Sequence, residues 1–387
     1  QLDEPKRTEA IMNSVANHQP DPPARTGHSA ATPAKVEPLP SETPTWRRGF
    51  WSLIVTQFQG AFSDNVLKNL VVFLIVGTGL SLSDKHRIGE LVGALFALPF
   101  ILFSMSGGYL ADRYSKRTIT IGVKVFEIAI MTFATSALAF NNLPMQLASV
   151  FLLGTHSAFF GPSKYGLLPE LLTERRLSWG NGILELGTFT AIIFGTVVAG
   201  VTAEHLRGQH FWTGIFLIAL AVIGLITSLA IAKVPPADPG KKFRPNFFAE
   251  IWSQLKVIRN DRPLALALVG NTYFNFLGAL FLLNVFFFGS EVLKVSESKT
   301  GLLNVALAMG IGLGSVAAGY LSGGKIEYGL VPLGAIGLTA SGMALSVSWL
   351  SYSGALLRLG LLGFAGGFFI VPICALLQHR PDKKNKG

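Results

Sequence analysis

Charged residues are scarce in this chain. They make up 14% of its 387 residues, whereas hydrophobic residues make up 50%. Scarce charge, together with 42 glycines, is expected where helices pack against one another in lipid. A formal net charge of +10 would suggest a nucleic-acid partner in a soluble protein. Here the basic residues gather in the loops between apolar segments, so we predict no nucleic-acid binding.

Cysteine is nearly absent as well, because Cys374 is the only one, which rules out a framework of internal disulfides. The spacing that glycerophosphate acyltransferases need, His followed five positions later by Asp, is also missing. None of the histidines has it: His18, His28, His86, His156, His205, His210 and His379. Gly-x-Gly matches lack a preceding strand and are no evidence of a cofactor site. We therefore predict no enzyme activity, no cofactor and no metal site.

Residues 1–45 have almost no large apolar side chains and hold 8 of the 20 prolines. Such a composition cannot bury enough surface to fold, so we predict a disordered tail. The first apolar run begins only near Phe50, and no secretory signal peptide is expected. Because the chain begins with Gln1 rather than Met, we expect its natural start to lie upstream.

Ten apolar segments follow this tail. About 20 apolar residues, at 1.5 Å of helix rise each, cross the hydrocarbon core of a bilayer. The segments are 50–80, 88–110, 118–140, 144–162, 180–203, 211–232, 263–290, 300–322, 328–349 and 355–378. We therefore predict an all-α integral membrane protein. Prolines inside the segments are tolerated because neighbouring helices satisfy the freed backbone groups.

Lysine and arginine in the loops set the orientation of such a protein. With the N-terminus in the cytoplasm, 20 of these residues fall on the cytoplasmic side and five on the other side. We expect a multi-pass protein of the cell membrane with its N-terminus in the cytoplasm.

The connection 233–262 divides the chain. Its second half places Phe247, Ile251 and Leu255 on one face of a helix, with Lys256 beside them. This pattern fits a helix lying on the inner membrane surface. A solvated linker helix packed against the floor of the bundle is the alternative.

The two halves of the chain repeat each other at an offset of 211 residues. Gly108-Tyr-Leu ends the second segment and Gly319-Tyr-Leu ends the eighth, while Asp64 in the first segment corresponds to Asn275 in the seventh. Parallel six-helix repeats with a long cytoplasmic connection describe the major facilitator architecture.

That architecture has twelve helices in two bundles, of which we find ten. We therefore expect two helices of the second bundle to follow the last residue. The predicted domains are a disordered tail at 1–45, a six-helix bundle at 46–232, a linker at 233–262 and a partial, four-helix bundle at 263–387.

The turn after the second segment has a more specific sequence. Gly108-Tyr-Leu-Ala-Asp112-Arg113-Tyr-Ser-Lys116-Arg117 resembles the loop signature of the major facilitator superfamily. Gly108 allows close helix approach, and Asp112 can pair with basic residues differently in two bundle positions. We predict a gating role for Gly108, Asp112, Arg113, Lys116 and Arg117. The alternative is that the basic residues only hold the loop in the cytoplasm.

The corresponding turn in the second half departs from this pattern. Gly323 takes the place of the acidic residue, and only Lys325 remains of the basic run. Any relay of charge pairs is therefore expected in the first half.

Asp64 and Lys68 lie in the middle of the otherwise apolar first segment. A charged group at that depth costs roughly 2.5–3.5 kcal/mol on insertion scales and usually faces the bundle interior or a water-filled path. A pair within the helix, at i and i+4, is one interpretation. The many polar neighbours, such as Asn65, favour a substrate or ion surface instead.

Further polar residues lie in other segments. Asn271 and Asn275 share one face of the seventh segment, and we expect Asp64 to face Asn275. Lys124 and Glu127 are spaced as an i, i+3 pair near the cytoplasmic end of the third segment, where Lys124 can also reach the surface.

His156 and Glu185 complete the candidates for substrate binding or coupling. For His156 a packing role is the alternative, and for Glu185 a place near the surface. The small residues Ala306, Gly310, Gly314 and Ala318 predict only tight helix contact.

Several stretches resemble the lysophospholipid transporter family of the same superfamily. They are 154–172 (GTHSAFFGPSKYGLLPELL), 60–69 (GAFSDNVLKN), 181–185 (NGILE) and 371–378 (VPICALLQ). The resemblance implies a carrier of the bacterial inner membrane that moves lysophospholipids, chiefly lysophosphatidylethanolamine, by alternating access. It also implies a soluble acyltransferase and acyl-carrier ligase as a partner or fused domain.

The chemistry of that substrate fits the candidates. Its head group carries an ammonium and a phosphate, for which Asp64 and Lys68, with Lys124 and Glu127, supply both signs. Phe286-Phe287-Phe288 permits an apolar route for the acyl chain. A proton-coupled carrier of drugs or small metabolites, with Asp64 as the protonated group, is the alternative.

Overall fold

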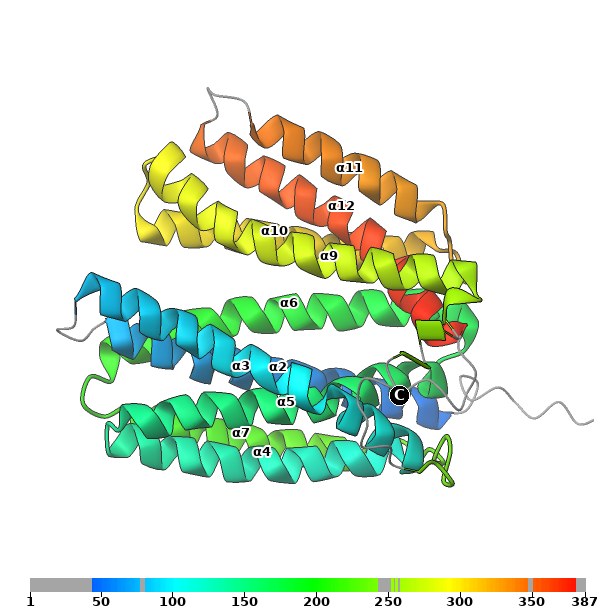
Figure 1. The fold of residues 1–387 in the computed structure, drawn as a ribbon, viewed down its shortest axis with the longest axis horizontal. Coiled ribbons are helices and arrows are strands. Elements are labelled where there is room, and N and C mark those ends of the chain that lie inside the picture. The colour runs from blue at the N-terminus through cyan, green and yellow to red at the C-terminus, as the bar shows by residue number, and fades with distance from the viewer. Residues whose placement is uncertain are drawn as a thin grey trace, which may run out of the picture. The chain divides into compact units, whose positions relative to one another are not determined.

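The computed structural model describes residues 44–76, 81–242, 252–253, 255–256, 258–346 and 351–380. The described residues form ten long helices, which confirms the predicted all-α class (Figure 1). They are α2 (Pro44–Val76), α3 (Leu82–Arg113), α4 (Lys116–Ala139), α5 (Leu143–Leu171), α6 (Glu174–His205), α7 (Phe211–Leu229), α9 (Arg262–Phe287), α10 (Glu297–Leu321), α11 (Leu330–Leu345) and α12 (Tyr352–His379). A π-helical turn, η2 (Phe288–Val292), extends α9.

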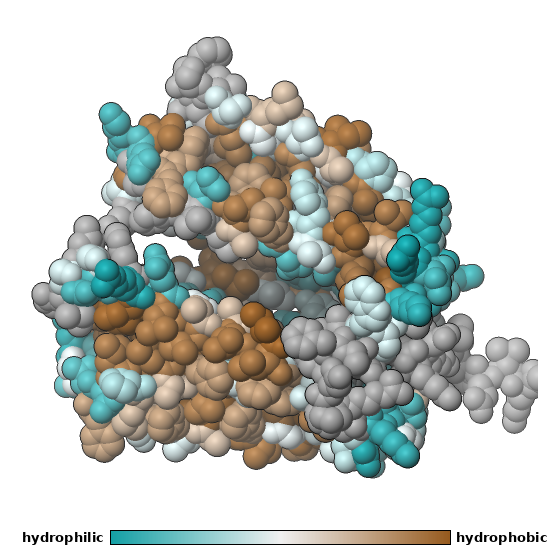
Figure 2. All heavy atoms as spheres, in the orientation of Figure 1, coloured by the Kyte–Doolittle hydropathy of each residue, from teal (hydrophilic) through white to brown (hydrophobic). Residues whose placement is uncertain are grey.

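Eight of the described helices are long and apolar enough to span a membrane. Of the other two, α2 has 33 residues but carries charged and amide groups along its length, and α11 has only 16 residues. Apolar side chains cover the sides of the helices, and polar ones gather at the helix ends (Figure 2). The chain is a multi-pass membrane protein.

Several helices extend beyond the predicted segments, and in α5 prolines do not end the helix. The fourth segment was expected to end at Pro162, but α5 continues through Pro162 and Pro169 to Leu171. Helix starts follow capping rules instead. Asn142 and Asp261 accept hydrogen bonds from the backbone N–H groups three residues later, and each is followed by a proline in the first helical turn.

The helices pack in two groups, which lie one above the other in Figure 1. In the first group α2 packs against α6 and α7, α3 against α5, and α4 against α5 and α7. In the second group α12 lies between α10 and α11 and also contacts α9. In the repeat, α9 corresponds to α2. Helices α6 and α7, which pack against α2, correspond to no helix of the second group among the described residues.

Two predicted regions lie largely outside the described residues. Of the tail at 1–45, only Pro44 and Thr45 are described, and they begin α2. Of the expected surface helix in the connection, only a few residues are described as helical, including Trp252, whose side chain is 73% exposed. The domain boundaries stay a prediction.

The two groups meet at one end of the helices. This end, here called the linker end, holds Arg113, Leu171, Leu229 and His379 together with the segment 230–242. Near it, a Cβ atom on Gly182 of α6 would lie 2.4 Å from the Ser315 carbonyl oxygen of α10, so the two backbones touch.

Toward the opposite end the two groups separate. Phe194 of α6 is 55% exposed and Met309 of α10 is 53% exposed. Figure 2 shows the opening between the groups on this side. The described unit is therefore closed at the linker end and open at the opposite end.

The predicted small-residue stripe is confirmed as a helix contact. A Cβ atom on Gly310 would lie 2.2 Å from the Gly360 carbonyl oxygen, and one on Gly314 would lie 2.1 Å from the Phe364 carbonyl oxygen. Helices α10 and α12 therefore pack backbone against backbone, as small residues allow in membranes.

We predict that Gly314→Ala lowers the free energy of unfolding by about 1–3 kcal/mol, because the added methyl group overpacks the contact with α12. Thermal unfolding of the purified protein in detergent measures this. The control is Gly278→Ala in α9, where a Cβ atom meets nothing within 4 Å. Equal melting temperatures for the two variants would contradict the prediction.

Candidate functional site

A network of buried polar side chains lies inside the first helix group. The Lys124 ammonium is 2.6 Å from Glu127 Oε2 and donates to Gln59 Oε1 at 2.8 Å. The Gln59 amide donates to Glu127 Oε1 at 2.8 Å and to Ser63 at 3.0 Å. These bonds join α2 to α4 in the interior of the group.

The network occupies space that two glycines leave open. A Cβ atom on Gly224 of α7 would lie 1.9 Å from Gln59 Oε1, and one on Gly60 would lie 2.8 Å from the Lys124 ammonium. Lys124 and Glu127 are completely buried. The alternative, in which Lys124 reaches the surface, is therefore not found, since its side chain turns inward to the Glu127 carboxylate.

His156 of α5 also lies in this interior and is fully buried. Its Nε2 is 3.3 Å from Glu127 Oε2, although neither ring nitrogen makes a hydrogen bond within the described part of the chain. The Phe160 ring lies 6.3 Å from the His156 ring and 5.4 Å from the Lys124 ammonium.

Asp64 faces α5 rather than the second helix group. Its Oδ2 accepts a hydrogen bond from Ser157 at 2.6 Å, while Oδ1 is buried without a hydrogen-bond partner among the described residues. Asn275 donates instead to the Asn271 carbonyl of its own helix. The expected approach of Asp64 to Asn275 is not found.

The alternative of an internal Asp64–Lys68 pair is not found either. The Lys68 ammonium donates to Asn65 Oδ1 at 3.3 Å and lies 4.9 Å from the centre of the Phe96 ring. Asn65 in turn donates to the Ala61 carbonyl at 2.8 Å.

A cavity of about 530 Å³ lies between the two helix groups and is here called the central cavity. It brings together three of the predicted residues, Glu185 of α6 and Asn271 and Asn275 of α9. The rest of its lining was not predicted: Tyr165, Gly166, Pro169, Thr188, Phe189, Phe274, Ile370, Cys374, Leu377 and Gln378. Its walls are therefore partly polar and partly apolar.

Glu185 carries the negative charge of this cavity. Lys164 and Tyr165 of α5 interact with its carboxylate, and the Lys164 ammonium lies 4.5 Å from the centre of the Tyr165 ring. The alternative, a place for Glu185 near the surface, is not found, because Glu185 lines the central cavity. Lys164 was not predicted as a site residue, although it lies in the 154–172 stretch that resembles the lysophospholipid transporters.

One hydrogen bond links the polar face of α2 to the wall of the central cavity. The Gln57 amide donates to the Thr188 hydroxyl at 3.1 Å, and Thr188 lines the cavity. The buried network itself does not line it.

The turn after α3 ties the linker end of the first group together. The Lys241 ammonium is 2.5 Å from Asp112 Oδ2, and the Asp238 N–H donates to the Asp112 carbonyl at 2.8 Å. Asp112 is fully buried. The connection after α7 is therefore fastened to the end of α3.

Basic residues of the same turn bind the neighbouring helices. Arg117 donates to the carbonyls of Leu229 and Ile231, both at 2.8 Å, and Lys116 pairs with Glu170 of α5. Arg113 donates to Tyr109 and to the Lys241 carbonyl. Gly108 is buried in α3 beside this turn. All these contacts lie within the first group and the connection.

The corresponding turn of the second group is built differently. Gly323 and Gly324 have φ angles of +58° and +80°, in the left-handed region that favours glycine. Lys325 pairs with Glu327 at 2.7 Å, and its carbonyl accepts from Ser178 of α6 at 3.3 Å.

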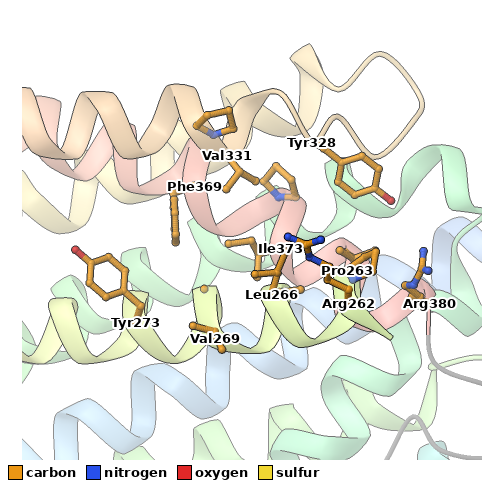
Figure 3. Close-up of a pocket in the computed structure, with 15 residues that line it drawn as sticks. Arg262, Pro263, Leu266, Val269, Tyr273, Tyr328, Val331, Phe369, Ile373 and Arg380 are labelled. Carbon is orange, nitrogen blue, oxygen red and sulfur yellow. The ribbon is translucent and has the colours of Figure 1, made fainter. Parts of the chain in front are cut away.

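A larger apolar groove of about 790 Å³ lies on the second group and is here called the outer groove (Figure 3). Leu266 and Val269 of α9 face Phe369 and Ile373 of α12 across it. In the first group, α7 packs against α2 and α4, which correspond in the repeat to α9 and α11. The outer groove therefore lies on the second group at the position that α7 occupies on the first.

Arg262 and Arg380 lie at the linker end of the outer groove. Arg380 Nε lies 2.6 and 2.8 Å from the two carboxylate oxygens of Asp261. This hydrogen bonding holds the pKa of Asp261 below its ordinary value.

We predict that Lys124→Met destabilises the protein by about 3–5 kcal/mol, because it leaves the buried Glu127 carboxylate without its cation. Thermal unfolding in detergent measures the effect. The double variant Lys124→Met with Glu127→Gln removes both charges and is expected to recover most of the stability. A double variant no more stable than the single one would contradict the role of the pair.

Known proteins resemble this chain in sequence and in fold. The family model of the Major Facilitator Superfamily matches residues 47–387. The lysophospholipid transporter LplT of Salmonella newport is 30% identical over 354 residues, which cover 90% of this chain and 84% of that protein. The protein of the same name from Salmonella typhimurium has the same identity and coverage.

Two solved structures share the fold. The human organic anion transporter MFSD10 has a TM-score of 0.75 at 14% identity, covering 89% of this chain and 88% of its own. The transporter FucP, in the outward conformation, has a TM-score of 0.68 at 13% identity, covering 88% and 87%. The chain is thus a membrane transporter rather than an enzyme, and it belongs to the Major Facilitator Superfamily, where it is related to the lysophospholipid transporters.

Proposed function

We propose that this transporter carries lysophospholipids, such as lysophosphatidylethanolamine, across the bacterial inner membrane by alternating access. The central cavity is the observation that supports this most. It lies between the two helix groups and sets Glu185 and the amides of Asn271 and Asn275 beside apolar Phe274 and Ile370. An amphiphile with a polar head group and one acyl chain needs such a lining. The similarity to LplT supports the same substrate class.

The charges around the cavity suit a zwitterionic head group. The Glu185 carboxylate accepts hydrogen bonds from the ammonium group of the substrate. Lys164, which lies beside Glu185, provides a cation for the phosphate. Lys124 and Glu127 are fully buried and neutralise each other, so we assign them to holding α2 and α4 in place.

We propose that the substrate also contacts residues of α2 nearer the open end of the helices, namely Asp64, Asn65 and Lys68. By helix rise, Asp64 lies about 30 Å from the start of α2, whereas Glu185 lies about 16 Å from the start of α6. Both helices begin at the linker end, so Asp64 lies closer to the open end. We propose that the linker end and the N-terminus face the cytoplasm, where an acyltransferase partner or fused domain would use the delivered lysophospholipid.

A proton-coupled carrier of drugs or small metabolites is the second candidate. Asp64 Oδ1 and His156 Nδ1, both buried without a hydrogen-bond partner within the described first group, favour it. In proteoliposomes, an imposed pH gradient would drive such a carrier, and loss of the drive in Asp64→Asn would support this function.

The turn after α3 is proposed as the gating loop. Asp112 with Lys241, and Arg117 with the end of α7, fasten the connection between the two groups to the first one. A movement of the second group therefore pulls on this turn through the connection.

Translocation of labelled lysophosphatidylethanolamine in proteoliposomes tests the proposed substrate. Glu185→Gln and Asp64→Asn are each expected to lower the rate about tenfold or more, because each removes a charged hydrogen-bond partner of the head group. Glu90→Gln is the matched control, since Glu90 is exposed on α3 away from the cavity. No translocation by correctly folded wild-type protein would reject the lipid assignment.

For the gating loop, we predict that Asp112→Asn lowers the maximal rate several-fold and leaves the apparent KM unchanged, because the loop does not line the cavity. The control is Asp238→Asn, a neighbouring acid whose carboxylate accepts, among the described residues, only from Gly240 N–H. A change in KM alone would argue against a gating role.

A further inference from the structure

Two amide side chains join the helix groups beneath the central cavity. The Asn181 amide of α6 donates to Gln378 Oε1 of α12 at 2.9 Å, and the Gln378 amide donates to Asn181 Oδ1 at 2.8 Å. Asn181 is 0% exposed and Gln378 is 8% exposed. The two residues are 197 positions apart and belong to different groups, so this reciprocal pair spans the contact between them.

The pair lies where the transporter is closed. Gln378 also lines the central cavity, one turn from Cys374 on the same helix. On the other side of Asn181, Ser178 donates to the Lys325 carbonyl, and a Cβ atom on Gly319 would lie 2.9 Å from the Trp179 Cα atom. The amide pair therefore separates the cavity from the linker end.

We propose that Asn181 and Gln378 form an amide latch that closes the cavity toward the linker end and opens in each transport cycle. The proposal rests on the proposed alternating-access function. Two neutral amides suit a contact that must break repeatedly, because water replaces their hydrogen bonds on opening. A buried ion pair would instead leave uncompensated charges whenever one partner moved away.

The latch also makes Gln378 a substrate-contacting residue. Its amide has a second N–H and its oxygen a second lone pair, neither of which the bonds to Asn181 use. Because Gln378 lines the cavity, a head group that binds these atoms acts on the latch directly. Binding and opening are thus coupled through one side chain.

Cys374 allows the latch to be tested without an engineered label site. It is the only cysteine of the chain, is half-buried and lines the cavity. A membrane-impermeant maleimide is applied to the complete protein in vesicles of either orientation. In the wild type, Cys374 is expected to react faster from the opposite-end side. Gln378→Met, which keeps the side-chain volume, is expected to raise the labelling rate from the linker-end side about tenfold.

Matched variants separate the latch from general loosening. Asn181→Ala is expected to act in the same direction as Gln378→Met, and the exchanged pair Asn181→Gln with Gln378→Asn is expected to restore slow labelling. Asn284→Ala is the control, because within the described part of the chain the Asn284 amide donates only to the Leu280 carbonyl of its own helix. Thermal unfolding of each variant confirms that the folded protein is being labelled.

The two proposals fail in different ways. Labelling needs no substrate, so unchanged labelling from the linker-end side in both Gln378→Met and Asn181→Ala overturns the latch even where lysophosphatidylethanolamine is carried. Faster labelling in both variants, without any translocation of that lipid by the wild type, supports the latch and rejects the lipid assignment.

Discussion

The first helix group depends on the burial of Lys124 and Glu127 as a pair. Neither charge is tolerable alone in that interior, and their pairing needs the Gln59 amide and the space left by Gly60 and Gly224. A small displacement of α2, α4 or α7 would separate the paired charges or close the space beside the glycines. These three helices are therefore fixed to one another. In the proposed alternating access, movement is then left to the contact between the groups, where the buried amide pair carries no charge.

Among the described residues, that contact joins buried neutral groups and also includes an exposed pair, His379 Nε2 of α12 and Glu174 Oε1 of α6, which lie 3.3 Å apart. Gly182 and Gly319 bring the backbones of α6 and α10 together, and the amides of Asn181 and Gln378 supply the directional bonds. Backbone contact closes the gap between α6 and α10 without ordering many side chains. The hydrogen bonds between the two amides fix how α6 and α12 are aligned. The buried charge pair thus lies inside one group, whereas the buried amide pair lies between the two groups, where we propose that movement occurs.

Much of the fold could be predicted because lipid restricts the choice of structure. A chain of apolar segments that spans lipid many times folds as helices, so the apolar segments approximately located the ten described long helices, and the four-residue spacing of Gly310 and Gly314 indicated a helix contact. The site was harder to predict from the sequence. Asn181 and Gln378 lie 197 residues apart in apolar stretches, and the 211-residue repeat does not relate them. The offset of 211 was also over-interpreted: it places Asp64 and Asn275 at equivalent positions in two groups, which does not make them face each other.

The glycine turn at Gly323 and Gly324 has a consequence for the history of the repeat. By the offset, these two glycines take the places of Asp112 and Arg113, and both have left-handed φ angles. An arginine restored at position 324 would cost about 1–2 kcal/mol in backbone strain before making any contact. The left-handed main chain at this turn therefore disfavours the sequence of the first-half turn at these two positions.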